Sequence, residues 1–141
     1  MLVADGQNLK GSYSPNFEDK ERDDLMNTKE RTYPEIITRL PEADIHIEGI
    51  KAWILQGEKH QLVFFQMEPD VQVPHHSHDY DQWGMMIEGK MELTINGKTR
   101  LCEKGDEYVI PAHAGHSAKF LSKSRVMDFF SERNRYRAKI A

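Results

Sequence analysis

Short runs of alternating apolar and polar residues recur from residue 45 to residue 131, with turn-forming residues between them. Met91, Leu93 and Ile95, for example, alternate with polar residues and stop at Asn96-Gly97, a dipeptide typical of tight β-hairpins. Strands that recur at spacings of about 8 to 12 residues indicate an antiparallel sandwich or barrel. We therefore predict strands over residues 45–47, 51–56, 61–68, 71–73, 91–95, 98–102, 107–110, 116–121 and 125–131.

The first part of the chain, residues 1–44, lacks this alternation and carries a run of mixed charges. Ser14-Pro15 is typical of a helix start, and Pro34–Leu40 has the apolar spacing of a second short helix. We expect an N-terminal arm with one or two short helices, which packs on the barrel or on a partner subunit.

Basic residues alternate along the last segment, residues 132–141, and this pattern is typical of a solvated tail or an edge strand. No internal repeat is visible, and 141 residues fit one domain. The predicted organisation is therefore an arm (1–44), a single all-β barrel (45–131) and a basic C-terminal tail (132–141).

Composition and charge narrow the class of protein. With 23 acidic and 19 basic residues, the net charge of −4 gives no basic footprint for nucleic acid. The longest apolar runs fall far short of the about 20 residues that span a bilayer, and no secretory signal is visible. A single cysteine, Cys102, favours a reducing compartment. We expect a cytoplasmic protein that binds a small molecule, not nucleic acid or a membrane.

Five of the seven histidines fall in two short segments, 75–78 and 113–116. His76 and His78 are two residues apart in a strand-like stretch, which places both side chains on one face, and Gln82 continues that parity. Neutral imidazole is the commonest ligand for first-row transition metals. The pattern predicts a metal site formed by His76, His78 and His116, with Gln82 either as a fourth ligand or hydrogen-bonded behind the ligands.

These residues resemble the two motifs of the cupin superfamily. The stretch from His76 to Gly89 is similar to the first motif, with Gln82 where Glu is usual, and the stretch from Gly105 to His116 is similar to the second. Asp70 and His113 stand where the motifs have glycine. The resemblance implies a single-domain, jelly-roll-like cupin barrel that binds one divalent transition metal: Zn, Ni, Mn or Fe.

A narrower resemblance is to the small cupins of pectin degradation, which convert ring-form unsaturated uronates into open-chain keto sugars. Asp128 and Phe130 match an Asp and a Phe on the last strand of those proteins, and the resemblance implies an acid/base role for Asp128 and sugar packing for Phe130. The Arg of that family falls on Asn134, between Arg133 and Arg135. Small cupins of this type commonly pair, so we expect a homodimer.

The chemistry follows from the neutral Gln82, which leaves the full charge on a divalent ion and favours Lewis-acid work on a carbonyl or hydroxyl. We therefore predict an isomerase- or lyase-type enzyme acting on a small, sugar-derived substrate. Tyr80 is a candidate for substrate binding, and His113 is either a loop residue at the mouth or an acid/base. Two alternatives stay open: a metal-dependent dioxygenase and a non-catalytic sensor or binding protein.

Overall fold

A computed structural model describes residues 32–140, which fold into nine strands and one short helix. The helix, expected at Pro34–Leu40, is confirmed as α3, whereas the helix expected after Ser14 lies outside the described residues. No helix in this part of the chain is long and apolar enough to cross a membrane. The elements are α3 (Glu35–Thr38), β1 (Ile50–Gln56), β2 (Gln61–Met67), β3 (Gln72–His76), β4 (Gln82–Glu88), β5 (Lys90–Ile95), β6 (Lys98–Glu103), β7 (Glu107–Ile110), β8 (His116–Phe120) and β9 (Ser124–Phe130).

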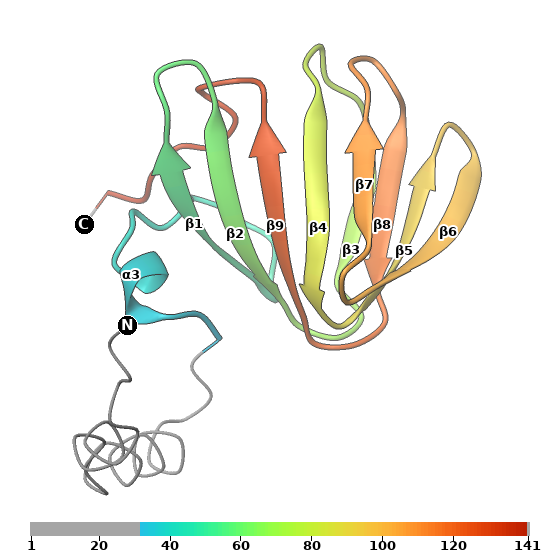
Figure 1. Cartoon of the computed structure of the whole chain (residues 1–141), viewed down its shortest axis with the longest axis horizontal. Helices are drawn as coiled ribbons and strands as arrows, with labels where there is room; N and C mark the ends of the chain where they lie inside the picture. The colour runs from blue at the N-terminus through green and yellow to red at the C-terminus, as the bar shows by residue number, and fades with distance from the viewer. Residues whose placement is uncertain (1–31, 141) are drawn as a thin grey trace, which may run out of the picture. The chain divides into compact units, whose positions relative to one another are not determined.

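The strands form two antiparallel sheets that face each other (Figure 1). One sheet has the order β1-β2-β9-β4-β7, and the other has the order β3-β8-β5-β6. Alternate side chains point between the sheets and form the core; in β2 and β9 every second residue is buried. The predicted all-β, jelly-roll-like fold is confirmed.

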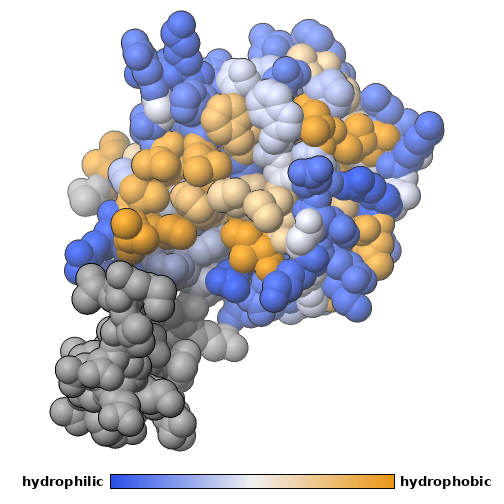
Figure 2. Space-filling model, in the orientation of Figure 1, coloured by the Kyte–Doolittle hydropathy of each residue, from blue (hydrophilic) through white to orange (hydrophobic). Residues whose placement is uncertain are grey.

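The outer face of the five-stranded sheet is also apolar, and Figure 2 shows apolar side chains gathered over β1, β2 and β9. The strand register places Leu55, Leu62, Phe129, Trp83 and Val109 in one row across all five strands. Leu55, Trp83 and Val109 are each more than 40% exposed. Such a row on a monomer is typical of an interaction surface.

The strand expected at residues 45–47 is wrong: this segment is a loop that leads to β1. Ile45 and Ile47 alternate with His46, but no neighbouring strand pairs with them, and their side chains line the cavity described below. Three residues of alternation are too few to distinguish a strand from a loop that lies over an opening between two sheets.

The chain on either side of the barrel is held to it by backbone hydrogen bonds. The amide of Ala43 donates to the carbonyl of Ala52 on β1, and the amide of Lys139 donates to the carbonyl of Glu42. The buried Gln61 side chain donates to the carbonyl of Tyr136 and accepts from its amide. The C-terminal segment is therefore fixed over one end of the barrel.

Candidate functional site

Three histidines meet at one end of the space between the sheets. His76 ends β3 and pairs in register with His116, which begins β8, and His78 follows two residues later in the loop before β4. One nitrogen from each of the three rings lies within 4.8 Å of the others. His78 was expected on the same strand face as His76; instead, a loop brings it to the same point.

The protein backbone orients all three rings in the same way. The Nδ1 atoms of His76, His78 and His116 lie 2.9, 2.8 and 2.9 Å from the carbonyl oxygens of residues 74, 80 and 114. Since a carbonyl only accepts hydrogen bonds, each Nδ1 carries the proton, and each Nε2 presents a lone pair. The Nε2 of His116 is buried and has no hydrogen-bond partner among the described residues. A buried acceptor of this kind fits a metal ligand.

Gln82, at the start of β4, contributes an oxygen to the same group. Its Nε2 donates to Asp128 Oδ2 at 3.2 Å, and this contact turns its Oε1 toward His78 Nε2 at 3.0 Å. Because Nδ1 of His78 already carries the ring proton, two acceptors face each other at that short distance. A cation between them removes the repulsion, so Gln82 fits a fourth ligand.

Burial favours the neutral form of two of these imidazoles. Together with the neighbouring His76 and His78 rings, burial lowers the pKa of His116 to about 4, against the opposing effect of the Ala114 carbonyl. Burial also lowers the pKa of His76. Metal ligation requires the neutral ring, so the environment of the cluster favours the ligating form.

Asp128 lies on β9, beside the histidine cluster, and is 7% exposed. Burial raises the pKa of its carboxyl to about 7, although hydrogen bonds from Tyr108 and Gln82 and the charge of Arg135 oppose the shift. The Tyr108 hydroxyl donates to Oδ1 at 2.5 Å. Asp128 is thus a carboxyl with a pKa near neutrality, connected through Gln82 to the candidate metal centre.

Sequence reasoning missed Tyr108, which reaches Asp128 because Gly84 stands between them. Gly84 pairs in register with Tyr108 of β7 on one side and with Asp128 of β9 on the other. A Cβ at Gly84 would lie well under 3.0 Å from both the tyrosine ring and Asp128 Oδ1. A Gly inside a strand signals a close approach of this kind, but only the strand register identifies the two partners.

A cavity of about 260 Å³ between the sheets contains this group. Its lining includes His76, Gln82, His116, Asp128 and Phe130, whereas His78 and Tyr80 are not among the lining residues. Its lining also includes Arg135 from the C-terminal segment, whose Nε is buried without a hydrogen-bond partner among the described residues.

Tyr80 and His113, the two remaining candidate residues from the sequence, differ in how they contact the histidine cluster. The Tyr80 ring stacks on His78, with ring centroids 4.2 Å apart and planes within 3° of parallel. The His113 side chain is exposed and is not part of the cavity lining, but its amide donates to the carbonyl of His78 at 2.7 Å. His113 therefore holds the ligand loop through its backbone, while an acid/base role for its ring stays a prediction.

A two-sheet antiparallel barrel with three histidines converging at one end of its interior defines the class of β-barrels with a candidate metal centre. Residues 63–130 match the family model described as Cupin domain. The match spans both histidine segments, so the predicted resemblance is confirmed.

Solved structures agree with this assignment. KdgF from Halomonas sp. is 29% identical with a TM-score of 0.62, over 67% of this chain and 87% of that one. An RmlC-like cupin from Shewanella frigidimarina is 20% identical with a TM-score of 0.64, over 76% and 94% of the two chains, and shares the fold. No curated protein matches the chain in sequence.

Proposed function

We propose that this cupin is a metal-dependent enzyme that acts on a small uronate-like acid. The observation that carries the proposal is the convergence of three histidine nitrogens with Asp128 in one cavity. The similarity to KdgF, together with the resemblance of Asp128 and Phe130 to positions in the small cupins of pectin degradation, supports the uronate class.

His76, His78, His116 and Gln82 would hold one divalent ion, with Zn, Ni, Mn and Fe all compatible with these ligands. When bound, the ion would polarise a carbonyl or hydroxyl oxygen of the substrate as a Lewis acid. Gln82 adds no negative charge, and this neutrality favours Lewis-acid chemistry over redox chemistry.

Asp128 would accept the proton of the anomeric hydroxyl as the ring C–O bond at that carbon breaks, and the enolate left at C5 would become a ketone when Asp128 returns the proton to C4. A pKa near 7 suits this exchange, because a group that titrates near the working pH both takes up and releases protons readily. Phe130 would pack against the sugar ring, and Tyr80 would support the ring of His78.

Arg135 would bind the substrate carboxylate. Its guanidinium lies over the Tyr136 ring, 4.8 Å from the ring centroid, and its buried Nε is free to donate a hydrogen bond to an anion. It replaces the family Arg that is missing at Asn134, because the C-terminal segment that carries it is fixed to Gln61.

The decisive experiment combines metal analysis with an assay on an unsaturated uronate, in which turnover removes the absorbance of the C4–C5 double bond. Asp128→Asn should retain the metal and lose turnover, while the exposed Glu92→Gln serves as the matched control. Wild-type activity in Asp128→Asn contradicts the acid/base role. Intact metal content in the double variant His76→Ala/His116→Ala contradicts the metal centre.

Two measurements on the wild-type protein distinguish this proposal from a dioxygenase and from a non-catalytic sensor. A dioxygenase consumes oxygen, so an equal rate without oxygen excludes it. A sensor binds the uronate without converting it, and the ionisable Asp128 inside the cavity argues against a purely binding role.

A further inference from the structure

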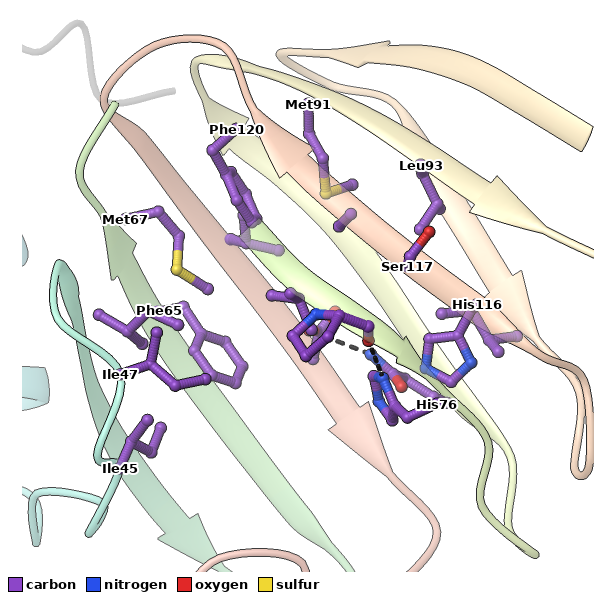
Figure 3. A pocket seen from close by; sticks show the side chains of 18 of the residues that line it. Ile45, Ile47, Phe65, Met67, His76, Met91, Leu93, His116, Ser117 and Phe120 are labelled. Carbon is purple, nitrogen blue, oxygen red and sulfur yellow. Dashed lines mark hydrogen bonds between the residues drawn. The ribbon is translucent and has the colours of Figure 1, made fainter. Parts of the chain in front are cut away.

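The cavity has a polar end and an apolar end, and Figure 3 shows His76 and His116 far from Ile47, Phe65 and Met67. The same gradient follows the strands. Along β8, alternate residues run from His116 through Ala118 to Phe120. Along β9, they run from Phe130 through Asp128 to Val126.

The lining of this end is mainly apolar, and the described polar side chains nearest to it are Ser117 and Tyr136, whose ring packs edge-on against Phe65. Its wall is formed by side chains that are at most 4% exposed: Phe65, Met67, Met91, Leu93, Phe120 and Val126. The backbone groups of these strands are already engaged in the two sheets. A substrate hydroxyl placed against this wall would lose its hydrogen bonds to water for few replacements, whereas a hydrocarbon group would gain by leaving water.

We propose that the preferred substrate has two parts: an oxygen-bearing acid head, and a short aliphatic group that occupies the apolar end. The head meets Asp128, Arg135 and the histidine cluster, and for this part the inference rests on the proposed function. A bare uronate uses the polar end alone, so an acid with an apolar substituent should bind more tightly than a uronate of the same charge.

The test uses 2-hydroxy acids of increasing chain length, from lactate to 2-hydroxyhexanoate, with galacturonate as the polar comparison. Binding is followed by NMR of ¹³C-labelled methionine methyl groups, with and without Zn²⁺. The signals of Met67 and Met91, which line the wall, should shift, while that of Met85 on the outer sheet face should not. The dissociation constant should fall about fourfold for each added CH₂ until the cavity is full.

Filling the apolar end provides the matched variant. Ala118→Leu should abolish the dependence on chain length, whereas Lys119→Leu, on the exposed side of the same strand, should keep it. If Ala118→Leu does not fold, the wild-type series still decides. Affinity independent of chain length, or no shift at Met67 and Met91 under either condition, overturns the inference. An equal response with and without Zn²⁺ supports the apolar end while contradicting the metal centre.

Discussion

Gly84→Ala should damage the candidate site by forcing Tyr108 and Asp128 apart. The new Cβ would fall well under 3.0 Å from the Tyr108 ring and Asp128 Oδ1, and ordinary contacts begin near 3.4 Å. Tyr108 is 6% exposed and Asp128 is 7% exposed, so both side chains are packed against neighbours and can move apart only by disturbing that packing. The substitution must therefore separate the tyrosine hydroxyl from the carboxyl.

Two losses set the magnitude. A hydrogen bond to a charged group contributes about 1.5 to 3 kcal/mol, and overfilling a packed core costs about 1 to 3 kcal/mol. Replacing a strand glycine returns about 0.5 to 1 kcal/mol of backbone entropy. We expect the free energy of unfolding to fall by about 2 to 5 kcal/mol, and Tyr108→Phe, which removes only the hydroxyl, to lose about 1.5 to 3 kcal/mol.

Urea unfolding of the metal-free protein measures these losses, and calorimetry with Zn²⁺ measures the site. Gly57→Ala is the matched control, because its Cβ would meet only the exposed ring of His60, which can rotate away. A loss in Gly84→Ala no larger than in Gly57→Ala would refute the reasoning. So would unchanged Zn²⁺ affinity, since Asp128 orients Gln82.

Three further predictions follow from the same structure. His113 adopts a φ of 69°, so His113→Gly should raise the unfolding free energy by about 0.5 to 1 kcal/mol, as measured in urea, while His113→Ala should not. Burial raises the pKa of Asp128 to about 7, so its neutral carboxyl stabilises the metal-free protein most below about pH 4 to 5. The free energy of unfolding should fall by up to about 4 kcal/mol as pH rises through 7. A pH series of thermal melts should show this loss in the wild-type protein and not in Asp128→Asn. If the apolar outer row joins two copies, Leu55→Glu with Trp83→Glu should convert a dimer into a monomer in light scattering, and an unchanged mass would exclude that face.

The fold was predictable because two independent sequence signals indicate most strands: the alternation of apolar and polar residues, and the turn-forming residues that bound them. Asn96 and Gly97 both have positive φ, 48° and 79°, as the two-residue hairpin requires. The 45–47 segment alternates and is followed by a turn at Glu48-Gly49, but it has no partner strand and stays a loop. Alternation reports which face is buried, but pairing needs a second segment that is distant in sequence.

The ligands were predictable from the spacing of the motifs and not from strand parity. Strand parity requires His76 and His78 to share one strand, but β3 ends at His76. His78 reaches the cluster because backbone hydrogen bonds hold the loop before β4: the His113 amide donates to the carbonyl of His78, and the Ser131 amide donates to the carbonyl of Asp81. Motif spacing captured this loop without describing it.

Asp70 and His113 show what the motif glycines are for. Both residues replace a glycine of the family motifs, and both adopt left-handed backbone, with φ of 68° and 69°. The loops therefore keep the conformation that the motif glycines favour, at the cost of local strain, and the ligands stay in place.

Arg135 had no such signal: it reaches the cavity only because Gln61, on a strand far away in sequence, holds Tyr136 by two hydrogen bonds. A cation supplied by a docked tail can change position by one residue without disturbing the barrel, which explains how the family Arg could be lost at Asn134 while a guanidinium remains in the cavity.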